Sequence, residues 1–227
     1  MISPPHEGAA VRVMPMTTGD PRVETKRVPY AFAKRAFDLL CASALLLLLA
    51  PLMMVLALIV RLTSKGPAFY RSTRVGLGGR EFKFLKFRSM YVDADQRLAD
   101  LQAQNEKDGP IFKMKDDPRV TPIGRFIRKY SMDELPQLVH VFVGEMSMVG
   151  PRPPVPREVA AYDAACLERL CVKPGISCYW QVMGRSNLSF EEWMELDRRY
   201  VREMSFWTDL VILLKTPAAV LRGRGAY

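Results

Sequence analysis

The chain has 227 residues, enough for one domain of ordinary size once a polar start and one long apolar stretch are set aside. Its 33 Lys and Arg against 24 Asp and Glu give a net charge of +9, which favours a polyanionic partner: nucleic acid, an anionic lipid surface or a phosphorylated substrate. The four cysteines lack the pairwise spacing of a zinc site, so reduced thiols are the simpler interpretation.

Residues 1–30 are rich in Pro, Thr, Gly and charge and show no helical or strand period. We therefore predict a disordered leader on the cytoplasmic side. The next segment, 31–62, contains a run of roughly twenty uncharged residues, the length of a helix that crosses a bilayer. Because this run ends at Arg61 rather than at a signal cleavage site, we expect the segment to stay in the membrane.

Two features leave the course of this membrane segment open. Pro51, preceded by Ala50, lies near its midpoint, where proline removes a backbone hydrogen bond and bends a helix. Basic residues such as Lys34 and Lys65 lie before and after it, so the bias of positive charge toward the cytoplasm does not identify an outer end. From these features a kinked crossing and a re-entrant hairpin are equally good predictions.

Residues 68–76 and 80–90 flank a short glycine-containing turn and predict a β-hairpin. Its basic residues are Arg71, Arg74, Arg80, Lys83, Lys86 and Arg88. They form either a solvated basic surface or a cradle for phosphate groups. The glycines do not form a nucleoside-triphosphate P-loop, because no Gly-Lys-Ser/Thr follows them.

Farther along, residues 92–106 are polar and helix-forming, and 116–124 form a turn-rich connector. Arg152 is presented by a stiff proline-rich loop. Ser189 and Glu192 match the capping box of another helix, and an apolar run follows at 210–214. Pattern alone favours core helices slightly over interfacial ones, although basic and Trp flanks keep the interfacial alternative open.

The densest group of reactive side chains lies between Arg128 and Gln137. Considered as structure, Ser131 starts a helix and Glu134 completes a capping box, and in isolation this interpretation is favoured. The adjacent carboxylates of Asp133 and Glu134, preceded by two cations, also fit a site for a divalent metal and phosphates. One acid would then bind the metal and the other would act as a nucleophile.

Several strings occur in the order found in bacterial sugar transferases, the monotopic polyprenyl-phosphate phosphoglycosyl transferases: KRAFDLL, KFLKFRSM, DDPRVTPIGRFIRKYSMDELPQL, GEMSMVGPRPP and KPGISCYWQVMGRSNLSFEEW. The chain resembles the short, exopolysaccharide-type members of this family from about Lys34 to Tyr227. The resemblance implies an α+β, mostly helical fold. A membrane hairpin bent at Ala50-Pro51 would be followed by a compact cytosolic catalytic domain, 63–227, with a short β-hairpin and amphipathic interfacial helices.

The resemblance also implies roles for individual residues. Asp133 resembles the family's nucleophile and Glu134 its ligand for Mg²⁺. The implied substrate-binding residues are Arg128, Arg152, Lys86, Arg88 and Gln137. The chain departs from the family pattern at four positions, which bear on sugar recognition more than on catalysis: His140 for Asn, Ser89 for Thr, Cys178 for Gly and Met183 for Asn.

The implied reaction transfers a hexose-1-phosphate from a UDP-sugar to undecaprenyl phosphate with release of UMP. Its implied partners are these two substrates and membrane lipids, with no nucleic acid, at the cytoplasmic face of the bacterial inner membrane; a homo-oligomer is left open. The alternative is a non-enzymatic, basic membrane-anchored adaptor or nucleic-acid-binding protein. That alternative gives no role to the Asp133-Glu134 pair, and neither interpretation specifies the sugar or the polysaccharide.

Overall fold

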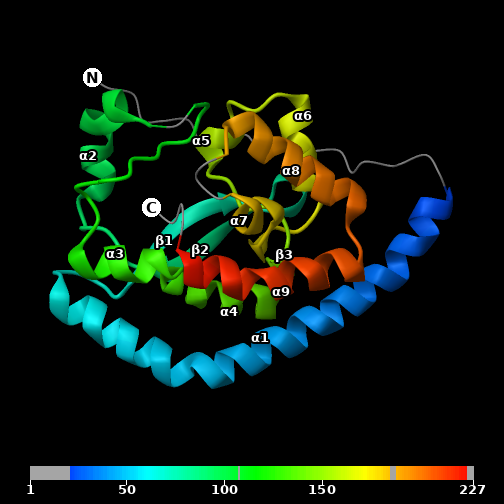
Figure 1. Cartoon of the computed structure of the whole chain (residues 1–227), viewed down its shortest axis with the longest axis horizontal. Coiled ribbons are helices and arrows are strands. Elements are labelled where there is room, and N and C mark those ends of the chain that lie inside the picture. Colours follow the sequence, from blue (N-terminus) through cyan, green and yellow to red (C-terminus); the bar gives the residue numbers. More distant parts are fainter. Residues whose placement is uncertain (1–20, 107, 185–187, 224–227) are drawn as a thin grey trace.

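The computed structural model describes residues 21–106, 108–184 and 188–223. Most of its elements are helices, and they surround one antiparallel strand pair and one short parallel pair (Figure 1). A long helix, α1 (Pro21–Thr63), lies as a bow beneath the rest of the molecule. The mostly helical fold with a small β-hairpin is confirmed.

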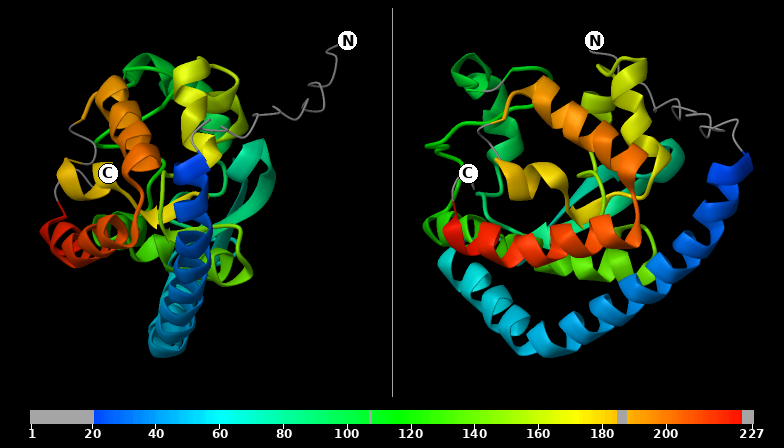
Figure 2. Two further views of the ribbon diagram at one scale, coloured as in Figure 1. Left: turned by 90° about the vertical axis from the view of Figure 1, so that its right-hand side faces the viewer. Right: turned by 45° about the vertical axis from the view of Figure 1, so that its right-hand side comes forward.

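Helix α1 differs from the predicted segment at its start and at its midpoint. It begins at Pro21, inside the range 1–30 that we expected to be a leader, and the first twenty residues of that leader lie outside the described residues. Helical structure also continues through Ala50-Pro51, so the expected break is not an interruption of the helix. Figure 2 shows instead a continuous bow whose two ends rise toward the same side. Proline bends a membrane helix without ending it when neighbouring groups satisfy the backbone.

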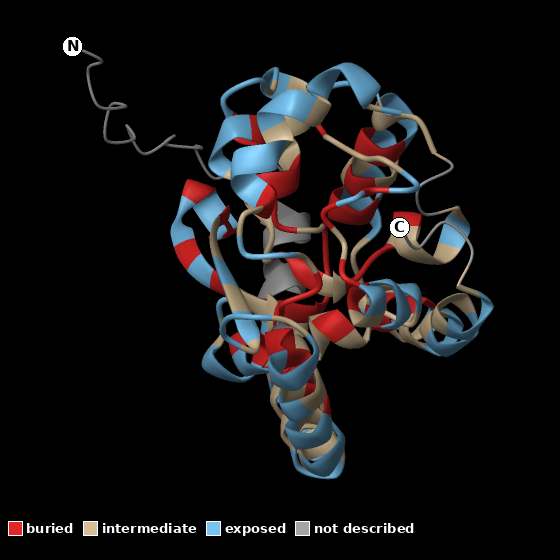
Figure 3. Cartoon of the chain, turned by 90° about the vertical axis from the view of Figure 1, so that its left-hand side faces the viewer, coloured by how far each residue is buried: buried red, intermediate tan, exposed pale blue. Residues whose placement is uncertain are grey.

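The convex surface of α1 is apolar and uncovered. Within Tyr30–Thr63, the most apolar window has a mean hydropathy of 2.8, and only 11% of that window is buried. Leu47, Leu48 and Met54 are 80%, 73% and 66% exposed, and Figure 3 shows buried residues gathered above this part of the helix. An exposed apolar surface of this extent requires an apolar environment, which a membrane supplies.

Two polar contacts fix the first half of α1 to the body. Asp38 is buried and its carboxylate accepts a hydrogen bond from the Met148 backbone N–H at 2.9 Å. Lys34 Nζ lies 2.6 Å from Asp209 Oδ2 and donates to the Val149 carbonyl at 3.1 Å. Because both sets of partners are buried in the body, the membrane segment has a defined orientation relative to the rest of the chain.

The predicted β-hairpin consists of β1 (Phe69–Val75) and β2 (Glu81–Phe87), which pair antiparallel and are joined through η1 (Leu77–Gly79). Gly78 has φ 65°, a conformation that glycine adopts at little cost. Tyr70 lies opposite Lys86 in the register. The short parallel pair joins β3 (Ser147–Val149) to β4 (Gly175–Ser177).

The remaining described elements are short helices followed by two longer ones: α2 (Ala94–Leu101), η2 (Gln102–Gln104), α3 (Pro122–Lys129), η3 (Met132–Gln137), α4 (Leu138–Val143), α5 (Pro156–Val159), α6 (Ala164–Leu167), η4 (Glu168–Cys171), α7 (Tyr179–Met183), α8 (Phe190–Glu203) and α9 (Phe206–Arg222). The main core lies where β2, α4, β3, α8 and α9 meet and includes Phe84, Val141, Met146, Tyr200 and Ile212.

The last two helices resolve the choice between core and interfacial packing in opposite ways. Helix α8 carries the predicted capping box, with the Glu192 N–H donating to Ser189 Oγ at 3.1 Å, and it buries Trp193 and Tyr200. It is a core helix. Helix α9 buries Ile212 but leaves Trp207 72% exposed. The exposed apolar surface expected of an interfacial helix is therefore found on α9 and not on α8.

Candidate active site

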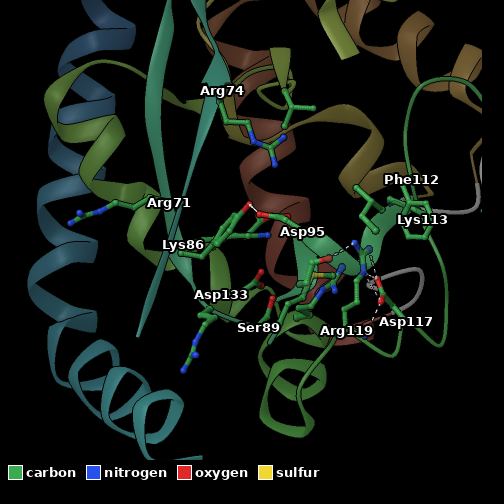
Figure 4. Close-up of a pocket in the computed structure, with 18 of the residues that line it drawn as sticks. Arg71, Arg74, Lys86, Ser89, Asp95, Phe112, Lys113, Asp117, Arg119 and Asp133 are labelled. Atoms are coloured by element: carbon green, nitrogen blue, oxygen red, sulfur yellow. Dashed lines mark hydrogen bonds and ion pairs between the residues drawn. The ribbon is translucent and has the colours of Figure 1, made fainter. Parts of the chain in front are cut away.

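A cavity of about 940 Å³ lies between the β-hairpin, the α3–η3 corner and two loops. Six of the predicted site residues line it: Asp133, Glu134, Arg128, Arg152, Lys86 and Arg88. Figure 4 shows Arg74 and Lys86 turned toward the same space as Asp133, whereas Arg71 points to the other side of the hairpin. Residues far apart in the sequence thus converge on one charged site.

The corner that carries Asp133 is built by an unusual backbone. Helix α3 ends at Lys129, and Ser131 then adopts φ 52°, the left-handed region that a non-glycine residue enters at a cost of about 1–2 kcal/mol. In this described part of the chain the Ser131 side chain makes no capping hydrogen bond, so the predicted capping box with Glu134 is not formed. Backbone strain of this kind is found most often at functional sites.

Helix α3 begins inside the segment that we predicted as a connector. Thr121 caps it by accepting a hydrogen bond from the Gly124 N–H at 3.0 Å, and Pro122 occupies its first turn. These residues are a helix-start signal that the turn-like composition concealed. A Cβ on Gly124 would overlap the backbone carbonyl of Ser89, so only glycine lets α3 pack this closely against the end of β2. This packing brings Arg128 to the cavity.

Burial and the neighbouring cations act on the pKa of Asp133 in opposite directions. The pKa of the Asp133 carboxyl is raised, because burial raises it more than the nearby cations Lys86 and Arg128 lower it. The pKa of Lys86 falls to about 8, first because of burial and then because of Arg128, while Asp133 acts in the other direction. The two cations therefore favour the ionised carboxylate that a nucleophile needs.

A second cationic pair lies across the cavity. Burial lowers the pKa of Arg74 to about 9, and the neighbouring Arg152 guanidinium contributes to this shift. Arg74 is 7% exposed and donates to the Pro153 carbonyl at 3.0 Å, while its Nε is buried without a hydrogen-bond partner. Two adjacent guanidinium groups repel one another, so an anion bound between them stabilises the pair.

The sequence analysis did not select Arg74, although strand alternation contains the signal. In the register, Lys86 faces Tyr70, and residues two apart on a strand share a face, so Arg74 lies on the same face as Lys86. Choosing Lys86 as a site residue thus implied Arg74 as well.

Two predicted substrate-binding residues have other surroundings. Arg88 lines the cavity wall, but its guanidinium donates to the Ser64 carbonyl and hydroxyl at 2.8 and 2.9 Å and so satisfies the end of α1. Gln137 is 2% exposed and is not among the described residues that line the cavity. The roles of these two residues in substrate binding stay predictions.

His140, one of the four departures from the family pattern, lies behind the sheet. Its Nε2 accepts a hydrogen bond from the Leu85 N–H at 3.0 Å, and its Nδ1 lies 2.7 Å from Glu145 Oε2. Leu85 directly precedes Lys86, so His140 fixes the strand that carries the lysine. His140 is absent from the described cavity lining, so at this position the departure from the family pattern affects the support of β2 and not the cavity wall.

The described residues contain no group of three or more His, Cys, Asp or Glu side chains that could hold a metal ion. Magnesium usually takes one or two carboxylates and completes its shell with water and substrate phosphates. Asp133 and Glu134, beside four cations that suit phosphate oxygens, are compatible with that mode of binding.

The family model described as bacterial sugar transferase matches residues 29–223. The chain belongs to this family. Membership makes it a transferase and sets aside the non-enzymatic adaptor. It also confirms the family identified from the sequence strings.

Among curated proteins, this sugar transferase is 42% identical over 199 residues to the exopolysaccharide production protein ExoY of Rhizobium meliloti, covering 86% of this chain and 88% of ExoY. It is 50% identical over 162 residues to the galactosyl transferase CpsE of Streptococcus agalactiae, covering 71% of this chain and 36% of CpsE. It is 43% identical over 203 residues to the undecaprenyl-phosphate galactose phosphotransferase of Salmonella typhimurium, covering 86% of this chain and 42% of that protein. The chain thus spans less than half the length of the last two relatives.

Proposed function

We propose that this sugar transferase moves a hexose-1-phosphate from a UDP-sugar to undecaprenyl phosphate and releases UMP, the first membrane step of exopolysaccharide or capsule synthesis. The observation that carries the proposal is the buried Asp133 carboxylate, which lines one cavity with Lys86, Arg128, Arg74 and Arg152. A nucleophile surrounded by cations suits a phosphorylated, anionic substrate.

In the first step, a carboxylate oxygen of Asp133 forms a bond to the sugar-bearing phosphorus, and the phosphoanhydride bond to UMP breaks. UMP leaves with the bonding electron pair. In the second step, a phosphate oxygen of undecaprenyl phosphate attacks the same phosphorus, and the bond to Asp133 breaks and restores the carboxylate. Lys86 and Arg128 stabilise the ionised nucleophile, and Arg74 and Arg152 stabilise negative charge on the phosphoryl oxygens.

Glu134 is the proposed ligand for Mg²⁺, which when bound offsets the charge of the pyrophosphate. The adjacent Asp133 is then left to act as the nucleophile. This division of roles gives both acids of the pair a function. Glu134→Gln should therefore weaken the response of UMP release to added Mg²⁺, and a response equal to that of the natural protein would remove Glu134 from this role.

We also propose that α1 re-enters the cytoplasmic leaflet and does not cross the bilayer. The support is its bow, with both ends on one side, together with the exposed apolar residues of α9 that lie along the body above it (Figure 1). This placement puts the cavity at the membrane surface, where a cytosolic nucleotide sugar and a lipid phosphate both have access. It also avoids moving a basic flank of α1 across the membrane.

Single cysteines at Thr17 and Glu191, in a variant lacking the four native cysteines, test this topology. In intact cells both should resist a membrane-impermeant thiol reagent, and both should react after lysis. Reaction of position 17 alone in intact cells would establish a crossing helix. The same assay with Pro51→Leu asks whether the bend depends on the proline.

The activity is tested with the full chain in detergent, undecaprenyl phosphate and a panel of UDP-glucose, UDP-galactose and their N-acetyl relatives. We expect UMP release with at least one of these donors. A variant with Asp116→Asn should release UMP like the unaltered chain, because Asp116 is exposed and does not line the cavity among the described residues. Absence of UMP release from every donor would overturn the proposed function.

A further inference from the structure

One end of the cavity combines aromatic rings with charged groups. Its described lining includes Trp180, Phe112 and Lys113, and Figure 4 shows Phe112 and Lys113 on a loop across the cavity from Lys86 and Asp133. Trp180 packs on Trp193 with ring centroids 4.5 Å apart. The reaction steps above use none of these side chains, so this part of the cavity has no role yet.

The aromatic end carries hydrogen-bond donors. Trp180 is 7% exposed, and its indole Nε1 is buried without a hydrogen-bond partner. The Lys113 ammonium lies 5.3 Å from the centre of the Trp180 ring, within the range of a cation–π contact. A buried indole N–H without a partner is costly, and because Trp180 lies in the cavity wall, an acceptor on a bound ligand would lower this cost.

Arg152 connects this end of the cavity to the phosphate-binding cations. Its guanidinium lies 5.9 Å from the centre of the Trp193 ring and also contributes to the lowered pKa of Arg74. A group bound against Trp180 would therefore lie beside phosphates held by Arg74 and Arg152. In a nucleotide sugar, the groups next to the phosphates are the ribose with its base on one side and the hexose on the other.

We propose that Trp180 and Lys113 form the uracil-binding subsite of the donor. This inference rests on the proposed function, because it assigns one part of the UDP-sugar to one part of the same cavity. Uracil is flat and carries two carbonyl acceptors, which match an aromatic ring, an indole N–H and an ammonium group. A hexose would also need acceptors for its hydroxyl groups, and one nearby carboxylate of the lining, Asp117, is already held by Arg119 at 2.7 Å.

The loop that carries Lys113 is held in place by hydrogen bonds within the protein. The Lys113 backbone N–H donates to Asn105 Oδ1 at 2.8 Å, and Asn105 Nδ2 donates to the Ile111 carbonyl at 3.0 Å. Ile111 is buried in the cluster that contains Trp180 and Trp193. This anchoring holds the loop against the tryptophan pair and reduces the ordering cost of binding a base.

Equilibrium binding of UMP to the full chain in detergent, measured by calorimetry, tests the proposal without requiring turnover. Lys113→Met should raise the Kd of UMP about tenfold, because it removes the cation and keeps the stem. Trp180→Phe should raise it about fivefold through loss of the N–H donor and part of the ring surface, and Trp180→Leu at least as much as either. Lys115→Met is the matched control, since Lys115 is exposed and absent from the described lining.

Three outcomes are informative. A weaker Kd for UMP in all three cavity variants, with Lys115→Met unchanged, supports the base subsite. Unchanged Kd values for UMP, combined with a changed preference among UDP-sugars, would assign this end of the cavity to the hexose and overturn the proposal. Failure of the transferase function appears separately, as absence of UMP release by the unaltered chain in the turnover assay.

Discussion

Helix α1 and the cavity present opposite kinds of unsatisfied surface. Leu47 and Leu48 on α1 are apolar and 80% and 73% exposed, whereas Arg74 and Lys86 are cations held in a partly buried cavity. Each region is costly in isolation, since apolar surface avoids water and grouped cations repel one another. The comparison shows that the two regions call for partners of different chemistry, an apolar environment for α1 and an anion for the cavity.

The largest effect on the reaction should come from removing the nucleophile. Asp133→Asn keeps the size of the side chain and abolishes its charge, so UMP release should fall at least about a thousandfold. The change conserves the volume of the side chain, so the melting temperature should stay close to that of the natural chain. Activity within tenfold of the natural chain would exclude Asp133 as the nucleophile, and Asp116→Asn should leave the rate unchanged.

The second change tests whether the cavity cations serve the substrate rather than the fold. Arg152→Gln should lower kcat/KM about a hundredfold, because it removes a donor to the developing phosphoryl charge. Relief of repulsion with Arg74 should leave thermal stability unchanged or slightly higher. Arg125→Gln provides the comparison, since Arg125 is exposed on α3 and should alter neither quantity. A large loss of stability in Arg152→Gln would make Arg152 a structural residue.

A buried cation that is paired within the protein should matter for stability, in contrast to Arg152. Arg169 and Asp197 are 2% and 1% exposed at their side chains and lie 2.7 Å apart. Asp197→Asn leaves a buried guanidinium without its counter-ion, which costs about 3–5 kcal/mol of stability. Thermal unfolding in detergent should show this loss, and Glu195→Gln on the exposed side of the same helix should barely change the melting temperature. Equal melting temperatures for both variants would contradict the distinction.

The same two regions differ in how far sequence predicted them. The membrane segment follows from local composition, and the β-hairpin and the Ser189–Glu192 capping box follow from local pattern. The cavity required long-range information. Motif order brought Asp133 and Arg152 together, but Arg74 and Trp180 enter only through strand register and the packing of distant helices.

The errors of prediction have local physical causes. Turn-forming composition hid the Thr121 cap of α3, because threonine before proline serves turns and helix starts alike. Ser131 was predicted to cap a helix, but it instead adopts a left-handed conformation that the spacing of polar residues does not reveal. Sequence also cannot show that the guanidinium of Arg88, which lines the cavity, donates to the Ser64 carbonyl after the last turn of α1, so its role in substrate binding stays a prediction.

The activity should depend on pH through the ionisation of Lys86. Burial lowers the pKa of Lys86 to about 8, so this cavity cation loses its proton as pH rises through that value. We expect kcat/KM for UMP release to fall about tenfold for each further pH unit, because kcat/KM reports the ionisation of the free enzyme. Lys86→Arg keeps its charge at these pH values and should move the decline to higher pH.

Stability should change in the opposite direction over the same range, which separates deprotonation from unfolding. The unfolded lysine keeps its ordinary pKa of 10.5, so between about 8 and 10.5 the unfolded state binds more protons than the folded state. The free energy of unfolding contributed by Lys86 therefore rises with pH in this window. An alkaline loss of activity that tracks a falling melting temperature, or that Lys86→Arg leaves unmoved, would show that another group controls the decline. If activity falls while stability holds, the cation at residue 86 is required by the substrate and is a cost to the fold.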